Sequence, residues 1–298
     1  MMTGVIFAVD VGGGTIKMGK FTVNGELLER WSIPTRLENN GENILKDIAE
    51  EIKAHIGDDS FIGVGIGLPG PVTKEGVILG CVNLGWGTFN VEEKLSSLLD
   101  GVRVKAGNDA TLAALGEKWK GSGKACEDVV FITVGTGVGG GIVVGGRLVF
   151  GVNGAAGEIG HMPLVRGMEE RCTCGKRGCL DQVSSAKAIV KEAGGNFTDA
   201  KEVFEAAKAG DEKALAAVNK AAKYLGLGLA AIASVTNPQI IIIGGGVSKA
   251  GDFFIEKIKA SFNEHTFTPC KQDVEIKPAT LGNKAGIYGA ASLILRGW

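Results

Sequence analysis

Three of the chain's six cysteines lie close together in the polar stretch RCTCGKRGC. Their spacing is Cys172-x-Cys174-x₄-Cys179. A closed tetrahedral zinc site needs four nitrogen or sulfur ligands. Of the three histidines, His161 lies just upstream of the cysteines, which makes it the most economical fourth ligand. We therefore expect a structural Zn²⁺ site, and redox use of the Cys-x-Cys pair is the alternative.

Glycine-rich turns follow three apolar runs, in DVGGGTIKMG, VGTGVGGGI and IIIIGGGVS. The backbone N–H groups of such a turn can bind an anion, although any one of these turns alone is better explained as a tight hairpin. Two of them open the two halves of the chain and carry hydroxyl residues, Thr15 in the first and Thr133 and Thr136 in the second. This repetition favours a triphosphate held from two sides. Asp10 ends the first strand, where a carboxylate can hold Mg²⁺ through water.

The pair Asn108-Asp109 stands between an apolar run and an Ala/Leu-rich segment, in AGNDATLAALGEKW. Both residue types favour the N-cap of a helix, which is the simpler interpretation. The functional interpretation is a general base, because phosphoryl transfer to a hydroxyl needs a carboxylate that accepts its proton. Asn108 would then hydrogen-bond a neighbouring hydroxyl. The two interpretations are compatible.

The chain of 298 residues is long enough for one large or two ordinary domains, and 45% of it is apolar. A net charge of −1 gives no electrostatic reason to expect nucleic acid or an anionic membrane as partner. There is no apolar run of membrane-spanning length and no signal-peptide pattern at the start. We expect a cytoplasmic protein, where clustered cysteines are more often metal ligands than disulfides.

Strands and helices alternate along the chain in two halves of similar pattern. Apolar runs predict strands within 5–10, 15–23, 26–33, 61–72, 129–151, 238–248 and 273–281. Helical spacing is found in 40–57, 185–193, 199–209, 211–235, 251–265 and 284–295, and 102–119 reads as a strand followed by a helix. This pattern predicts mixed sheets covered by helices, in two α/β domains rather than in one doubly wound sheet.

In this order, the three glycine turns resemble the first phosphate, second phosphate and adenosine motifs of the sugar kinase, Hsp70 and actin superfamily. The stretch EIGH followed by CTCGKRGCLD resembles the signature of the ROK family of sugar kinases and repressors. The resemblance implies two similar actin-like ATPase (ribonuclease H-like) α/β domains with an interdomain cleft. The first would comprise residues 1–118 with the C-terminal helix 284–298, and the second residues 119–283.

The resemblance also implies an ATP-dependent hexokinase that converts ATP and D-glucose to ADP and glucose 6-phosphate with Mg²⁺, and commonly a homodimer or homotetramer. Asp109 would be the catalytic base. His161 would bind zinc through one ring nitrogen and the sugar through the other. The sugar-binding positions would be Gly70, Asn83, Asn108, Asp109, Glu158, His161 and Asp181. The ATP-binding positions would be Asp10, Gly12, Gly13, Gly14, Thr15, Lys17, Gly135, Thr136, Gly137, Gly245 and Gly246.

The sequence departs from the family pattern at two places. Related kinases have Asp-x-Gly-Gly-Thr at the first turn, where this chain has Gly14 before Thr15. After the last zinc cysteine they have Gly-Cys-x-Glu with the glutamate on the sugar, whereas this chain reads GCLD, so Asp181 stands in that place.

Three alternatives remain beside the glucokinase interpretation. An N-acetylhexosamine kinase, acting on N-acetylglucosamine or N-acetylmannosamine, would use the same residues. A sugar-sensing transcription regulator would need a helix-turn-helix module before the first phosphate motif, which here starts at Asp10. A chaperone-type ATPase would have no use for the zinc motif.

Overall fold

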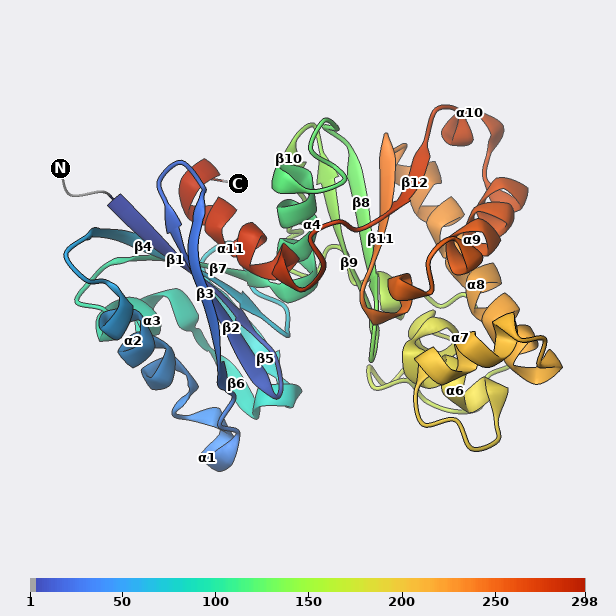
Figure 1. Cartoon of the computed structure of the whole chain (residues 1–298), viewed down its shortest axis with the longest axis horizontal. Coiled ribbons are helices and arrows are strands. Elements are labelled where there is room, and N and C mark those ends of the chain that lie inside the picture. The colour runs from blue at the N-terminus through green and yellow to red at the C-terminus, as the bar shows by residue number, and fades with distance from the viewer. Residues whose placement is uncertain (1–3, 298) are drawn as a thin grey trace. The chain divides into compact units, whose positions relative to one another are not determined.

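The computed structural model describes residues 4–297, which form two compact units (Figure 1). Unit 1 contains the chain up to Lys124, the segment Arg147–Ala156 and the chain from Asn283 onward. Unit 2 contains Ala125–Gly146 and Gly157–Gly282. The predicted domain bounds, 1–118 with 284–298 and 119–283, stay a prediction. The compact units differ from them at 119–124, 147–156 and 283, which join unit 1.

Unit 1 is built on a five-stranded mixed sheet in the order β3-β2-β1-β4-β7. Strands β1 and β2 and strands β2 and β3 are antiparallel, whereas β1, β4 and β7 are parallel. The strands are β1 (Gly4–Val11), β2 (Thr15–Thr22), β3 (Leu27–Pro34), β4 (Ser60–Leu68) and β7 (Arg103–Asn108). The predicted mixed sheet is thus confirmed for this unit.

The central strand β4 explains how helices cover both faces of this sheet. It alternates Gly63, Gly65 and Gly67 with buried Val64, Ile66 and Leu68. The apolar face packs with the buried side chains of α2 (Ile44–His55) and α3 (Val91–Leu98). A Cβ on Gly65 would lie 1.8 Å from the Ala290 carbonyl, so only glycine lets α11 (Ala285–Arg296) approach the other face. There α11 packs beside α4 (Asp109–Lys120).

Several short elements of unit 1 lay outside the sequence predictions. They are α1 (Glu38–Gly41), the antiparallel pair β5 (Val77–Cys81) and β6 (Trp86–Asn90), and the 3₁₀ turn η1 (Val82–Leu84) between these two strands. Helix α3, which follows β6 directly, was not predicted either. The side chain of Asn90 caps this helix by accepting a hydrogen bond from the Glu93 N–H.

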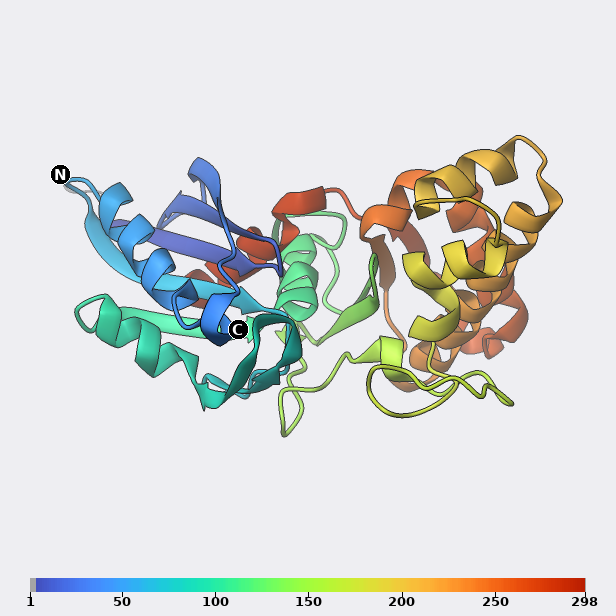
Figure 2. The same cartoon turned by 90° about the horizontal axis from the view of Figure 1, so that it is seen from below.

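Unit 2 has four strands in the order β9-β8-β11-β12, and the two-residue β10 (Arg147–Leu148) follows β9. Strands β8 and β9 are antiparallel, and β8, β11 and β12 are parallel. Buried residues of β8 and β11 form one core with the helices, which gather on one face of the sheet (Figure 2). The elements are β8 (Val129–Val134), β9 (Val138–Val144), β11 (Ile240–Gly244), β12 (Glu275–Pro278), α6 (Ala186–Ala193), α7 (Ala200–Lys208), α8 (Glu212–Thr236) and α9 (Asp252–His265).

The predicted helix starts in unit 2 are confirmed by their caps. The side chains of Ser185, Asp199 and Asp211 each accept a backbone N–H from the first turn of α6, α7 and α8. Two one-turn helices complete the unit, α5 (Asp181–Ser184) and α10 (Thr268–Lys271). Within residues 4–297, every helix is too short or too polar to span a membrane.

Candidate active site and metal centre

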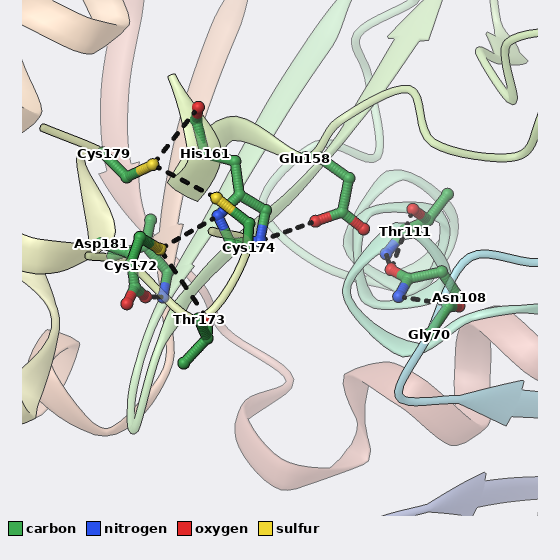
Figure 3. Close-up of polar contacts among 11 residues, drawn as sticks. Gly70, Asn108, Thr111, Glu158, His161, Cys172, Thr173, Cys174, Cys179 and Asp181 are labelled. Carbon is green, nitrogen blue, oxygen red and sulfur yellow. Dashed lines mark hydrogen bonds and ion pairs between the residues drawn. The ribbon is translucent and has the colours of Figure 1, made fainter. Parts of the chain in front are cut away.

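The four predicted zinc ligands converge in unit 2. The ligand atoms of His161, Cys172, Cys174 and Cys179 all lie within 4.8 Å of one another (Figure 3). The Sγ atoms of Cys174 and Cys179 are 3.6 Å apart, and Cys172 Sγ is 3.6 Å from His161 Nδ1. Tetrahedral zinc with bonds of about 2.3 Å to sulfur places its sulfurs about 3.8 Å apart. The donor set and its spacing therefore fit a closed zinc site.

Backbone contacts join the segment that follows His161 to the segment that carries Cys179. Pro163 and Cys179 form an isolated antiparallel bridge, and the Leu180 N–H donates to the Met162 carbonyl at 2.9 Å. Gly178 has φ of 76°, and a Cβ there would lie 1.9 Å from the Val165 carbonyl oxygen. Only glycine fits this close approach, so the predicted turn residue is also a packing residue.

The sulfurs differ in their surroundings. Burial raises the pKa of Cys179 to about 12, and its hydrogen bonds with Cys174 and Cys172 act in the same direction. A hydrogen bond from the Lys176 N–H lowers the pKa of the exposed Cys174. Zinc binds cysteine as thiolate, so metal binding would release the proton that Cys179 holds.

His161 presents its two ring nitrogens to different partners. It lies in the 3₁₀ turn η2 (Ile159–His161), with Nδ1 toward the cysteine sulfurs and Nε2 4.0 Å from Glu158 Oε2 (Figure 3). The side chains of both residues are more than one third exposed. The geometry thus leaves one nitrogen for a metal and the other, with the Glu158 carboxylate, for a ligand that offers hydroxyl groups.

Asn108 and Asp109 mark the junction of β7 and α4 in unit 1. Asn108 is the N-cap, since its Oδ1 accepts from the Thr111 N–H at 3.0 Å. Its Nδ2 donates to the Gly70 carbonyl at 3.3 Å, which joins two of the predicted sugar residues (Figure 3). An amide carries two N–H donors, so one remains for a ligand hydroxyl.

Asp109 is the first residue of α4, and its Oδ1 accepts the Ala110 N–H at 2.7 Å. The helix N-terminus favours the ionised carboxylate, which is the form a general base requires. Asn83, the remaining predicted sugar residue of this unit, lies exposed in η1. Unit 1 therefore carries Gly70, Asn83, Asn108 and Asp109, and unit 2 carries Glu158, His161 and Asp181.

The first glycine turn joins β1 to β2 with the strand pairing that the sequence predicted. The Gly12 N–H donates to the Thr15 carbonyl at 3.0 Å, and Gly13, Gly14 and Thr15 are exposed. Lys17 Nζ lies 3.0 Å from Asp10 Oδ2, so the predicted magnesium residue and the predicted phosphate cation form an ion pair. The exposed turn therefore has the Lys17 ammonium group and the Asp10 carboxylate beside it.

The second and third glycine turns lie in unit 2. Gly135 donates its N–H to the Gly137 carbonyl at 2.9 Å, and Thr136 and Gly137 are exposed. Gly245 follows β11 with φ of 83°, and a Cβ there would lie 2.3 Å from the Val134 carbonyl. The third turn therefore packs directly on the end of the strand that leads into the second turn. Gly246 opens the 3₁₀ turn η3 (Gly246–Ala250).

Sequence reasoning missed the contacts that two residues, Thr35 and Asp181, make at these turns. The Thr35 hydroxyl donates to the Gly12 carbonyl at 2.7 Å, and its N–H donates to the Gly14 carbonyl at 3.2 Å. Thr35 directly follows β3, and Pro34 at the end of β3 pairs with Thr15 of the turn. The adjacency of the strands predicted within 15–23 and 26–33 is the signal that could have located it. Asp181, expected on the sugar, accepts the Val138 N–H at 2.7 Å with its Oδ1. No sequence pattern pointed to this contact.

Comparison with known proteins assigns the family. The ROK family model matches residues 6–296. A glucokinase of Halalkalibacterium halodurans is 41% identical over 96% of this chain and 93% of its own length. A ROK glucokinase from Streptomyces griseus, solved with glucose and AMPPNP, is 32% identical with a TM-score of 0.82, covering 97% of this chain and 99% of that one. A ROK hexokinase from Thermus thermophilus is 32% identical with a TM-score of 0.85, covering 96% of each chain. The predicted actin-like ATPase fold is thereby confirmed, and the chain belongs to the ROK family.

Proposed function

We propose that this chain is an ATP-dependent hexokinase that phosphorylates the 6-hydroxyl of D-glucose. The observation that carries the proposal is Asp109, a carboxylate at the first position of α4 beside the capping residue Asn108. The similarity to glucokinases over nearly the whole chain supports glucose as the acceptor. The expected cytoplasmic location and the homodimer or homotetramer stay predictions.

In the proposed reaction, Asp109 accepts the proton of the 6-hydroxyl while the hydroxyl oxygen attacks the γ-phosphorus of ATP and ADP leaves. Asn108 offers its second amide N–H to a sugar hydroxyl, and the Gly70 carbonyl holds Asn108 in that orientation. His161 Nε2, Glu158 and Asn83 add further hydrogen bonds to the sugar.

The phosphates of ATP would be bound by the backbone N–H groups of the glycine turns. Lys17 brings a positive charge to the first turn, and Asp10 would hold Mg²⁺ through water. Bound Mg²⁺ supplies neutralisation of the β- and γ-phosphate charge. Gly245 and Gly246 would contact the adenosine. The residues proposed for the two phosphate turns are Gly12, Gly13, Gly14, Thr15, Gly135, Thr136 and Gly137.

We further propose that His161, Cys172, Cys174 and Cys179 hold a structural Zn²⁺. The 3.6 Å contacts among their ligand atoms support this assignment. A bound zinc would fix the His161 ring so that Nε2 keeps facing Glu158.

The test is a coupled assay of ADP release with Mg-ATP and a panel of glucose, N-acetylglucosamine, N-acetylmannosamine, mannose, fructose and no sugar. Asp109→Asn keeps the size of the side chain and an acceptor for the Ala110 N–H, but it cannot take a proton. We expect strong turnover with glucose and a loss of about 10²–10⁴ in kcat in the variant. Glucose binding, measured by calorimetry, should change little.

Asp252→Asn is the matched control, because Asp252 is also the first residue of a helix, α9. This variant should keep the activity of the unmodified chain. Turnover only with an acetylated sugar would move the proposal to an N-acetylhexosamine kinase. If zinc-replete protein shows no sugar-dependent turnover, the kinase proposal is refuted and a non-catalytic sugar sensor becomes the better interpretation. Full activity of Asp109→Asn would refute the role of the carboxylate.

A further inference from the structure

Val138, the first residue of β9, contacts both segments that carry the proposed metal ligands. Its N–H donates to Asp181 Oδ1 at 2.7 Å. A Cβ on Gly160 would lie 2.0 Å from the Val138 carbonyl oxygen, so the backbone of η2 packs directly against this oxygen. Asp181 is two residues from Cys179, and Gly160 is next to His161.

Val138 also ends the second glycine turn. Gly135, Thr136 and Gly137 precede it, and a Cβ on Gly137 would lie 3.0 Å from Asp181 Oδ1. A second bond ties the same segments, because the Ala186 N–H donates to the Gly135 carbonyl at 2.8 Å. Both ends of the turn are thus attached to residues 181–186, one through a carboxylate and one through the backbone.

From these contacts we infer that Asp181 is a positioning residue for the nucleotide, not a contact of the sugar: it holds the second glycine turn in the shape that binds the phosphates of ATP. The inference rests on the proposed function of that turn. The family resemblance implied a sugar contact for the glutamate of Gly-Cys-x-Glu, but this chain has Asp181 there, whose side chain is one methylene shorter. In this chain the carboxylate is used at the turn instead. The metal cluster then sets the geometry of the ATP site through Cys179, Asp181 and Val138.

A hydrogen bond from a backbone N–H to a carboxylate is stronger than one between neutral groups. Val138 is 8% exposed, so water replaces the lost partner poorly after Asp181→Ala. Loss of such a bond from a largely buried donor corresponds to a change of about tenfold to a hundredfold in an equilibrium constant. We expect KM for ATP to rise by about that factor, with KM for glucose within about threefold of the unmodified value. Asp181→Asn keeps an acceptor oxygen and should restore most of the ATP affinity.

The control is Asp211→Ala. Asp211 makes the same type of bond, Oδ1 to the Ala214 N–H at 2.8 Å, but at the start of α8. This variant reports the loss of stability that any such bond causes, and it should leave both KM values unchanged. Thermal unfolding and zinc content of all three variants exclude a general loss of structure.

Steady-state KM values for ATP and glucose are the first measurement, and calorimetric titration of zinc-loaded protein with the non-hydrolysable analogue AMPPNP is the second. A rise of KM for glucose without a rise for ATP would overturn the inference and return Asp181 to the sugar. Equal KM values in Asp181→Ala and the unmodified chain would also overturn it. If the unmodified chain shows no sugar-dependent turnover, the proposed function fails on its own, and the AMPPNP titration still decides the role of Asp181. AMPPNP affinity that is the same with and without Asp181 would then refute it.

Discussion

A single methyl group at Gly160 would disturb the proposed sugar residues without touching them. The Cβ of Gly160→Ala would lie 2.0 Å from the Val138 carbonyl oxygen, whereas ordinary contacts begin at 3.4 Å. Moving from 2.0 to 3.4 Å requires a shift of about 1.4 Å, shared between η2 and β9. Gly160 is not among the glycines with positive φ, so alanine fits its backbone conformation and the effect is steric.

The shift falls on the segment that holds both Glu158 and His161. A misplacement of about 1 Å at catalytic or substrate-positioning groups can reduce a rate about a hundredfold. We therefore expect Gly160→Ala to lower kcat/KM for glucose about a hundredfold. The overpacking itself should cost about 1–3 kcal/mol of stability.

The coupled ADP-release assay with glucose measures kcat/KM, and elemental analysis measures zinc in the same preparations. Gly87→Ala is the control, because a Cβ on Gly87 meets nothing within 4 Å and its φ is not positive either. A Gly160→Ala protein with normal zinc and kcat/KM within threefold of the unmodified chain would refute the reasoning, since it would show that η2 can move without consequence for the site.

Two further outcomes follow from the zinc cluster and from α11. Removing zinc with a chelator should lower the Tm of unit 2, measured by calorimetry, by about 8–16 °C. The reason is that zinc at about a thousand times its Kd adds about 4 kcal/mol to the free energy of unfolding. An unchanged Tm would contradict a structural metal. Gly289→Ala should reduce the free energy of unfolding of unit 1 by about 1–3 kcal/mol, although alanine is the better helix former, because its Cβ would lie 1.7 Å from the Leu112 carbonyl oxygen. Urea unfolding followed by tryptophan fluorescence measures this, and an unchanged or higher stability would contradict the packing of α11 on α4.

Much of the fold could be predicted because buried strands and glycine turns leave a strong pattern. The strand IIIIG is one example, and the cap at Asn108 followed from residue type alone. The pair β5–β6 was missed because VILGC and WGTFN are short and their exposure alternates irregularly. Helix α3 was missed because VEEKLSSL offers only two buried positions.

The candidate site divides in the same way. The cluster of His161 with three cysteines could be predicted because thiols and an imidazole at short spacing are typical of a metal site. The partner of Asp181 could not, because Val138 is distant in sequence and offers only its backbone N–H, which every residue except proline carries. The contact of Thr35 was missed for a related reason, because its hydroxyl bonds to the backbone of a turn that another segment forms.

The glycine face of β4 links the order of synthesis to the order of folding. Its cover, α11, begins only at Ala285, whereas β4 ends at Leu68. On a growing chain, unit 2 has all its residues before unit 1 receives its final helix. Gly63 and Gly65 therefore stay without this cover until the residues of α11 have been made. A chain that stops before α11 would keep every proposed ligand of zinc, ATP and glucose and still lack the cover of the sheet of unit 1.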